Sequence, residues 1–337
     1  MPKARLIVVG ATGTAMKRTI PALRGSEICA VTAIQGRNER KLATVAREYG
    51  IAKTYLSAEA MFDSERFDVV FIATPPFLHV NDVLLAARYG RPVICEKPLA
   101  HTLSGARRIA RAVGDARIPF MLAHQVRHQE AFAYLQATLS SGVIGEVRSA
   151  AGQWGFTLNP QASNASWKRD PELAGATVFY DAGIHVLDAF LALFGRPVSV
   201  LATGFTSLGY GAMDNAVAIF SYPTLAAVAS TSQTLSAPAN DLAVFGTDGR
   251  IEVPRLFGEV SADAVHVLAS GDNQSQTFAR TNLYRDEIED FLQLTHLGQS
   301  AIRGTTLQDA LGGMVLLDAI DRSIQERREV DVPATND

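Results

Sequence analysis

The chain has 337 residues and a formal net charge of −3, a length that suits two domains, each able to bury its own core. The charge balance provides no basic face, which argues against nucleic acid or an anionic membrane as the main partner. Two cysteines, Cys29 and Cys95, are too few for a disulfide framework or a cysteine-rich metal site. This cysteine usage suits a reducing compartment, so we expect a cytoplasmic protein.

No membrane segment is expected from the sequence. The apolar run Leu6–Val9 near the amino terminus is too short for the apolar core of a signal peptide. No stretch approaches about 18 uninterrupted apolar residues, the length at which a membrane-spanning helix is suspected.

The first part of the chain alternates strand-like and helix-like segments with short connections, a pattern typical of a parallel sheet covered on both faces. The expected strands are 5–9, 28–34, 69–73, 92–96 and 120–123. The expected helices are 15–23, 39–49, 78–89 and 103–113. We therefore predict an α/β domain with a doubly wound parallel sheet over residues 1–123.

From His124 the pattern changes, and residues 124–337 are predicted to form an α+β domain with a mostly antiparallel sheet. Helices are expected at 130–140, 180–194, 284–296 and 307–326, a long strand from Gly145 past Trp154, and further strands between 198 and 280. The runs Asn215–Phe220 and Leu225–Ser230 are rich in apolar and small residues. If both faces of these strands are apolar, the outer face needs cover, so we predict a homodimer or homotetramer joined there.

A glycine turn after the first strand is the first candidate site. Glycines at such a turn let the backbone approach a pyrophosphate, which rests on the free N–H groups that open the next helix. Threonine stands at position 12, where a second glycine is usual, and a plain strand-to-helix turn is the alternative interpretation. The residues predicted to bind a dinucleotide here are Gly10, Ala11, Thr12, Gly13, Thr14 and Ala15.

The end of the second strand indicates which dinucleotide is preferred. An NAD site usually has a carboxylate there to accept from the ribose hydroxyls, but residues 33–38 of this chain include no acid, and the next one is Glu39. Gly36 leaves room, and Arg37 offers a planar guanidinium suited to a phosphate. We therefore predict NADP(H), with NAD(H) possible if Arg37 is an ordinary surface arginine.

Three further side chains have the chemistry of an acid–base site. Lys97 follows the strand 92–96, at the sheet edge where ligands bind in open α/β sheets, although Glu-Lys-Pro is also a common surface turn. Asp181 and His185 are four residues apart and are predicted to share one face at the start of a helix. Histidine suits proton exchange in both directions near neutral pH. A helix-capping aspartate with a structural histidine is the alternative.

No metal site is predicted. Asp181 and His185 have no evident third ligand. His124 and His128 are also four apart, but Arg127 lies between them.

Taken together, the motifs resemble the Gfo/Idh/MocA oxidoreductase family, and they follow the order of that family from residue 5 to about residue 330. Beside the glycine turn, they are Ala73-Thr-Pro75 with His79, Glu96-Lys-Pro98, Ile144-Gly-Glu-Val147, Asp181-x-Gly183-x-His185, Phe245-Gly-Thr-Asp-Gly249 and Tyr284…Glu287-Ile…Asp290-Phe.

The resemblance implies a Rossmann domain followed by a substrate-binding and oligomerisation domain with an open mixed sheet. It implies that Lys97, Asp181 and His185 line the substrate site beside the nicotinamide. A Trp-Arg pair that often borders this pocket corresponds to Trp167 and Arg169, with Lys168 between them. The further residues that it assigns to the cofactor are Ala73, Thr74, Pro75, His79 and Glu96.

The expected activity is NADP(H)-dependent hydride transfer between the nicotinamide and a hydroxyl-bearing or carbonyl carbon of a sugar, cyclitol or related polyhydroxy compound. Two departures from the family pattern, Thr12 and Pro76, affect detailed cofactor contacts, and Gly36-Arg37 resembles the NADP-using branch. One alternative is a non-catalytic dinucleotide-sensing regulator, which has no need of Lys97, Asp181 and His185 together. The other is a glycosidase-like enzyme that uses a trapped NAD without net redox change.

Overall fold

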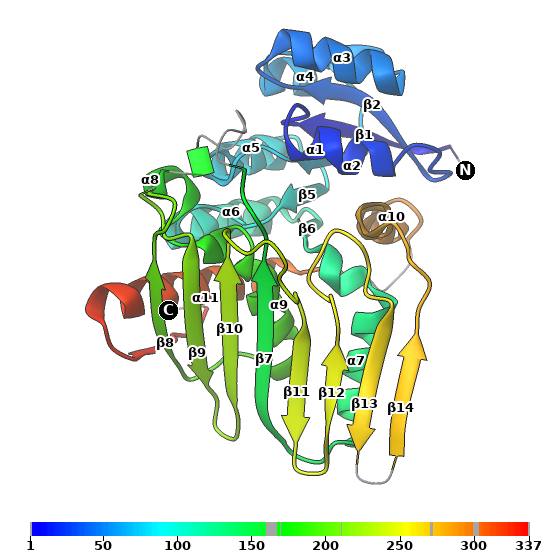
Figure 1. Cartoon of the computed structure of the whole chain (residues 1–337). Helices are drawn as coiled ribbons and strands as arrows, with labels where there is room; N and C mark the ends of the chain where they lie inside the picture. The colour runs from blue at the N-terminus through cyan, green and yellow to red at the C-terminus, as the bar shows by residue number, and fades with distance from the viewer. Residues whose placement is uncertain are drawn as a thin grey trace. The chain divides into compact units, whose positions relative to one another are not determined.

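The structure, a computed structural model, describes residues 2–159, 167–168, 170–209, 211–269, 272–298 and 303–335. It comprises two compact units. The first joins Met1–Gln125 with Tyr284–Leu307, and the second joins Val126–Leu283 with Gln308–Asp337. The fold class predicted from the sequence is confirmed: a parallel Rossmann sheet is followed by an open, mixed and mostly antiparallel sheet (Figure 1).

The first unit contains a six-stranded parallel sheet with the order β3-β2-β1-β4-β5-β6. Its strands are β1 (Ala4–Val9), β2 (Cys29–Gln35), β3 (Lys53–Tyr55), β4 (Val69–Ile72), β5 (Val93–Glu96) and β6 (Phe120–Ala123). Its helices are α1 (Thr14–Lys17), α2 (Thr19–Ala22), α3 (Glu39–Tyr49), α4 (Ala58–Ser64), α5 (Pro76–Arg88), α6 (Leu103–Ala116) and α10 (Leu283–Thr295). This is the strand order of dinucleotide-binding folds, in which ligands bind beyond the carboxyl ends of the strands.

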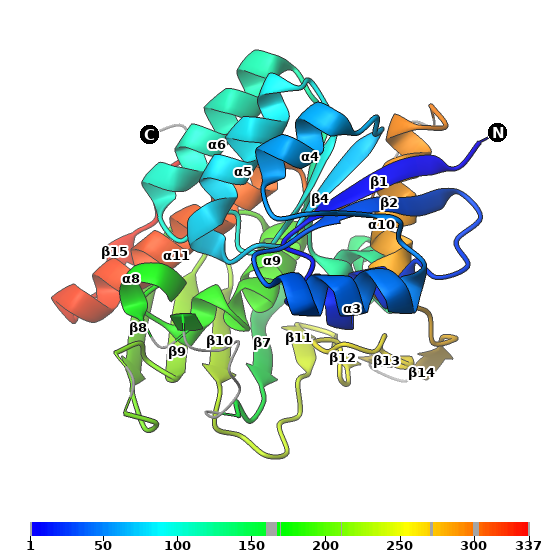
Figure 2. The ribbon, with the colours of Figure 1, turned by 90° about the horizontal axis from the view of Figure 1, so that it is seen from above.

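The central strands β1 and β4 are nearly continuous apolar runs because the sheet is covered on both faces. Alternate side chains such as Leu6 and Val8 point to one face and pack in a single cluster with Leu42 of α3 and Phe291 of α10. The helices α5 and α6 lie side by side (Figure 2).

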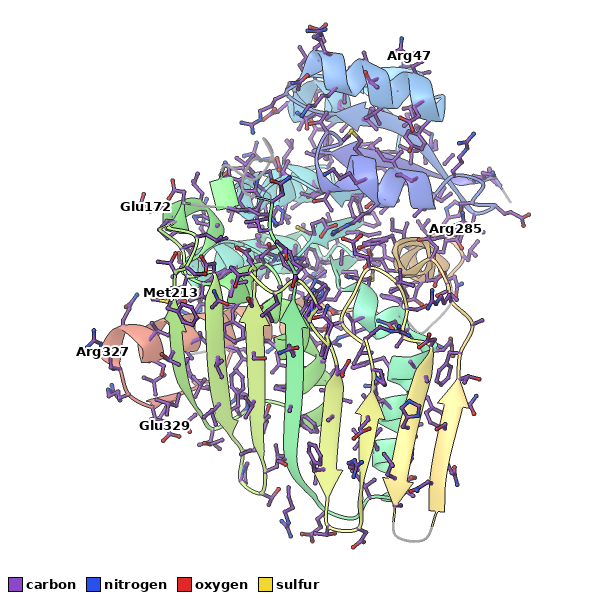
Figure 3. The ribbon with its side chains drawn as sticks, viewed as in Figure 1. Arg47, Glu172, Met213, Arg285, Arg327 and Glu329 are labelled. Carbon is purple, nitrogen blue, oxygen red and sulfur yellow. The ribbon has the colours of Figure 1, made fainter. Side chains whose placement is uncertain are left out.

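Helix α10 packs in the first unit although it follows the whole second sheet in the sequence. Its apolar residues join the first core, and Arg285 donates from Nε to the carbonyl of Ala22 at 2.7 Å and from Nη2 to that of Arg24 at 2.8 Å (Figure 3). The domain boundaries predicted from the sequence place this segment in the second domain, because a local apolar pattern does not tell which core receives it.

The second unit is built on a nine-stranded sheet with the order β14-β13-β12-β11-β7-β10-β9-β8-β15. The strands are β7 (Val147–Gly155), β8 (Ser199–Phe205), β9 (Asn215–Ser221), β10 (Ala226–Ser232), β11 (Leu242–Gly246), β12 (Gly249–Val253), β13 (Ala264–Ala269), β14 (Asp272–Thr277) and β15 (Val330–Asp331). The helical segments are η1 (Gln125–His128), α7 (Glu130–Ser140), α8 (Pro171–Ala174), η3 (Val178–Tyr180), α9 (Gly183–Phe194) and α11 (Leu307–Glu326).

The two faces of this sheet differ in their cover. Strand β10 runs parallel to β7, and the other described pairs are antiparallel. Helices α7, α9 and α11 lie behind the sheet in Figure 1. On β9, Ala218 and Phe220 are buried, whereas the alternate residues Val217 and Ile219 are 39% and 43% exposed. The strand therefore has one packed face and one apolar face open to solvent.

In the described part of the chain, no helix is both long enough and apolar enough to cross a membrane. The cytoplasmic location stays a prediction.

Candidate functional site

The glycine turn after β1 lies directly against the end of β4. Gly10 has a φ of +83°, and a Cβ there would come within 2.6 Å of the backbone nitrogen of Thr74. Both the backbone angle and this contact exclude other residues. By contrast, nothing lies within 4 Å of where a Cβ on Gly13 would stand, so the turn is open at that point. This open backbone fits the predicted approach of a pyrophosphate, and the contact itself stays a prediction.

Gln35, the last residue of β2, holds the glycine turn in place. Its side-chain oxygen accepts from the backbone N–H of Gly10 at 3.1 Å, and its Nε2 donates to the carbonyl of Leu56 at 3.1 Å. Its own carbonyl accepts from the N–H of Ala11 at 2.8 Å. Sequence reasoning missed Gln35. The signal was a polar residue at a position expected to be buried, beside a turn with N–H groups to satisfy.

The threonine at position 12 is accommodated by the glycine at position 36. A Cβ on Gly36 would lie 2.8 Å from Cγ2 of Thr12, so the threonine methyl group fills the space that Gly36 leaves. Arg37 follows and is exposed. Asn38 then caps α3, its Oδ1 accepting from the N–H of Lys41 at 2.9 Å. The backbone of Arg37 thus lies between Gly36 and the helix cap Asn38, and its side chain is exposed to solvent.

His79 connects the ends of β4 and β5. Its ring is fully buried, with Nε2 2.7 Å from the carbonyl oxygen of Thr74 and Nδ1 3.0 Å from that of Pro98. Burial lowers the pKa of His79 to about 4, so the ring is neutral and donates to one of the two carbonyls at a time. The residue therefore links the Thr74 loop to the Lys97–Pro98 turn. Its predicted direct contact with the cofactor stays a prediction.

Three more carboxyl groups, those of Asp82, Glu96 and Glu287, bear on these strand ends. The hydroxyl of Thr74 donates to Oδ2 of Asp82 at 2.6 Å, and burial raises the pKa of Asp82 to about 6. Glu96 is half-buried at the end of β5, next to the half-buried Lys97. Glu287 of α10 is buried, and its pKa is raised well above the ordinary value by burial and then by the charge of Glu96.

In the second unit, Lys168 and Gln233 are among the groups that hold Asp181. Its Oδ2 accepts from Nζ of Lys168 at 2.7 Å and from Nε2 of Gln233 at 3.1 Å. The side chains of Lys168 and Asp181 are about one quarter exposed, at 26% and 25%. The Nζ of Lys168 also lies 5.7 Å from the ring centre of Trp167. Sequence reasoning treated Lys168 only as a residue between Trp167 and Arg169. Arg169 lies outside the described residues.

The sequence placed Asp181 on the same helix as His185, and this is wrong in detail. Residues Val178–Tyr180 form a 3-10 turn, and α9 begins only at Gly183, so Asp181 precedes the helix. The apolar pattern of residues 178–180 is compatible with either type of turn, which is why the helix start was set too early.

His185 is buried on α9 and stacks on Trp154 of β7, with ring centres 4.2 Å apart and an angle of 31° between the planes. The helix can approach β7 closely because residue 152 is glycine. A Cβ on Gly152 would lie 2.6 Å from Cγ1 of Val186. Trp154, which sequence reasoning did not select, therefore packs against the imidazole ring.

A buried ion pair also holds α9 in place. Nε and Nη2 of Arg127 each donate to Asp188 at 2.8 Å, and Nη1 donates to Asp309 of α11 at 3.0 Å. The side chains of Arg127 and Asp188 are only 11% and 4% exposed. A bidentate pair of this kind defines orientation as well as contact. It secures α9 three residues after His185.

The predicted residues thus form two groups. In the first unit, the glycine turn, Thr74, His79 and Lys97 lie along the carboxyl edge of one sheet. In the second unit, Asp181 lies just before α9, where Lys168 and Gln233 donate to it. His185 lies in the first turn of α9 and contacts Trp154. The convergence of Lys97 with Asp181 and His185 stays a prediction.

Comparison with known protein families shows to which family this chain belongs. Residues 4–124 match the model described as the oxidoreductase family with an NAD-binding Rossmann fold, and residues 132–252 match the GFO/IDH/MocA C-terminal domain. The chain belongs to the Gfo/Idh/MocA oxidoreductase family. It is an oxidoreductase with an NAD(P)-binding Rossmann domain.

Known relatives of this Gfo/Idh/MocA protein include D-xylose 1-dehydrogenase (NADP(+)) 2 of Haloferax volcanii, which is 29% identical and aligned over 96% of this chain and 98% of that one. The aldose-aldose oxidoreductase of Caulobacter crescentus has a similar structure, with a TM-score of 0.87, 24% identity and coverage of 98% and 100% of the two chains. A levoglucosan dehydrogenase complex with NADH and levoglucosan also has a TM-score of 0.87, with 21% identity and the same coverage.

Proposed function

We propose that this protein is an NADP(H)-dependent oxidoreductase that transfers a hydride between the nicotinamide and a hydroxyl-bearing or carbonyl carbon of a sugar, cyclitol or related polyhydroxy compound. The observation that carries this proposal is the nearly full-length similarity to an NADP-dependent D-xylose dehydrogenase. Conversion between an alcohol and a carbonyl needs a hydride carrier, a group that exchanges the hydroxyl proton, and positive charge near the reacting oxygen.

The first unit supplies the residues that would hold the cofactor. The open backbone of the glycine turn would receive the pyrophosphate, and the exposed guanidinium of Arg37 would receive the 2′-phosphate of NADP. Thr74, Pro75 and Glu96 would border the nicotinamide. When bound, the nicotinamide accepts or supplies the hydride.

The second unit supplies the acid–base chemistry in this proposal. In the oxidative direction, His185 takes the proton of the substrate hydroxyl as the hydride leaves the same carbon. Lys97 stabilises the negative charge that develops on that oxygen. Asp181 binds a neighbouring hydroxyl, while Lys168 and Gln233 fix the position of its carboxylate. Trp154 prevents rotation of the His185 ring, so the accepting nitrogen keeps its direction.

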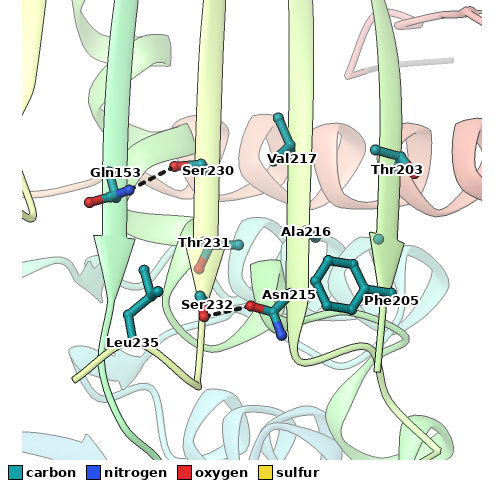
Figure 4. Close-up of a pocket in the computed structure, with 11 residues that line it drawn as sticks. Gln153, Thr203, Phe205, Asn215, Ala216, Val217, Ser230, Thr231, Ser232 and Leu235 are labelled. Carbon is teal, nitrogen blue, oxygen red and sulfur yellow. Dashed lines mark hydrogen bonds between the residues drawn. The ribbon is translucent and has the colours of Figure 1, made fainter. Parts of the chain in front are cut away.

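We also propose a homodimer or homotetramer, joined through the outer face of the nine-stranded sheet by a second copy of the same chain. This face displays a set of large apolar side chains from neighbouring strands, all 38–63% exposed: Leu201, Phe205, Val217, Ile219 and Val228. Between β8 and β7 the same face has a hollow of about 200 Å³, in which Gln153 pairs with Ser230 and Ser232 with Asn215 (Figure 4).

Within that hollow, Nε2 of Gln153 lies 3.4 Å from Oγ of Ser230, and the hydroxyl of Ser232 donates to Oδ1 of Asn215 at 2.7 Å. Polar groups already satisfied in this way can be covered at little cost. An exposed apolar patch over several strands is typical of an interaction surface.

The cofactor proposal predicts tighter binding of NADP⁺ than of NAD⁺, measured by titration of each cofactor. Arg37→Ala is expected to lose ~1.5–3 kcal/mol for NADP⁺, or roughly 10- to 150-fold, because a charge-assisted contact to the 2′-phosphate disappears. NAD⁺ binding should hardly change. Arg47→Ala, which removes the same charge from the last turn of α3, is the matched control. Equal affinity of the wild type for both cofactors would contradict the proposal.

The catalytic proposal predicts that His185→Ala lowers turnover by about 10²–10⁴-fold, the usual contribution of a general acid–base group. Lys97→Ala should cost roughly 10²–10³-fold or more, because one preorganised electrostatic contact is lost. Lys41→Ala is the matched surface control. Steady-state kinetics with the best sugar found in a screen measures both effects. Near-wild-type kcat with only KM raised would mean that the residue merely binds substrate, and Asp181 would become the next acid–base candidate.

The assembly proposal predicts a dimer or tetramer of the wild type at micromolar concentration by light scattering. Ile219→Lys should give a monomer, because it places a charge within the apolar face. Leu56→Lys, at a residue 55% exposed in the first unit, is the control and should leave the assembly intact. A wild-type monomer would refute the proposal.

A further inference from the structure

Tyr180, the residue before Asp181, is anchored to the last long helix of the second unit. Its ring is buried, and its hydroxyl donates to Oδ2 of Asp321 on α11 at 2.8 Å. The ring also packs directly against the backbone of Gly175, because a Cβ there would lie 2.3 Å from Cγ of Tyr180. Gly175 has a φ of +89°, so glycine is favoured there on both grounds. Tyr180 is therefore held between the end of α8 and α11.

The backbone around Asp181 is a short irregular turn. The N–H of Asp181 donates to the carbonyl of Val178 at 3.1 Å, and that of Ala182 donates to the same carbonyl at 3.0 Å. The N–H of Tyr180 donates to the carbonyl of Thr177 at 3.1 Å. These bonds define the backbone of the turn but tie it to no helix, and the phenol of Tyr180 is the side chain of the turn that reaches α11.

We propose that Tyr180 and Asp321 form a positioning pair that sets the placement of the Asp181 carboxylate for the reaction. The proposal rests on the role of Asp181 in the proposed function. Neither residue is assigned a contact with substrate or cofactor. Lys168 and Gln233 hold the carboxylate end of Asp181, whereas Tyr180 and Asp321 hold its backbone. Rigid support of this kind matters because a displacement of ~1 Å can cost about 10²-fold in rate.

Asp321 of this pair changes its protonation state near neutral pH. Burial raises the pKa of Asp321 to about 7, the hydrogen bond from Tyr180 opposes the rise, and the charge of Asp318 adds to it. Asp318 in turn pairs with Nε of Arg322 at 3.2 Å. A carboxylate accepts a hydrogen bond more strongly than a carboxylic acid does. The Tyr180 anchor therefore tightens as the pH rises through about 7.

The same titration affects stability with the opposite sign. The pKa of Asp321 is raised in the folded protein, so between the ordinary value and about 7 the folded state binds more protons than the unfolded state. The contribution of Asp321 to the free energy of unfolding therefore falls as the pH rises across that window. Above pH 7 it is constant.

The test is the pH profile of kcat/KM, measured with Tyr180→Phe, Asp321→Asn and Asp318→Asn beside the wild type. The wild type should gain activity through an ionisation near pH 7. Asp318→Asn should keep full activity at high pH and move this ionisation to lower pH, because it removes the charge that raises the pKa of Asp321. Tyr180→Phe and Asp321→Asn should lose the ionisation that Asp318→Asn shifts and keep that of the proposed base His185, and Tyr180→Phe should lose about tenfold in kcat. Cofactor affinity should stay unchanged.

Two outcomes would overturn the proposal that Tyr180 and Asp321 position Asp181. One is an unchanged ionisation in Asp321→Asn, which would assign it to another group. The other is wild-type kcat and profile in Tyr180→Phe. Asp181→Asn separates this failure from failure of the proposed function: if Asp181→Asn is fully active, the assignment of Asp181 falls. If Asp181→Asn is inactive while Tyr180→Phe and Asp321→Asn behave as wild type, only the positioning pair falls. Should Tyr180→Phe not fold, the two aspartate variants still decide the matter.

Discussion

The carboxyl edge of the six-stranded sheet depends on one close backbone approach, that of Gly10 to Thr74. Only glycine permits it, since a Cβ would come within 2.6 Å of a backbone nitrogen and φ is positive. Once the two strand ends are joined, His79 extends the connection from the carbonyl of Thr74 to that of Pro98, beside Lys97. The glycine turn and the turn that contains the candidate catalytic lysine are therefore connected through contacts at the ends of β1, β4 and β5.

In the second unit, the candidate site residues are held in place mainly by contacts between side chains. A buried, bidentate ion pair between Arg127 and Asp188 fixes the orientation of α9, and Gly152 lets this helix lie close to β7, where Trp154 stacks on His185. Buried ion pairs are costly to desolvate, so their value here is orientation more than stability. His185, the proposed base, is thus fixed through the regular elements α9 and β7.

Local patterns predicted much of the fold, and long-range contacts account for what they missed. The helix Glu39–Tyr49 and the strand Phe120–Ala123 have the predicted bounds because caps, charges and apolar runs are local signals. The predicted helix 15–23 is two short helices that break at Arg18, and the short strand Lys53–Tyr55 was not predicted. Of the candidate site, the residue types were predictable. Their partners Gln35, Lys168, Trp154 and Asp188 were not, because each acts through a contact distant in sequence.

The measurement that most directly tests the central claim is the fate of the transferred hydrogen. The enzyme is incubated with NADP⁺ and the best sugar substrate from a screen, deuterated at the carbon that is oxidised. The mass of the cofactor is then measured by mass spectrometry. Direct hydride transfer predicts NADPH that carries one deuterium, formed in equal amount to the oxidised sugar. Deuterium released to water, or sugar turnover without any net reduction of the cofactor, would contradict the account.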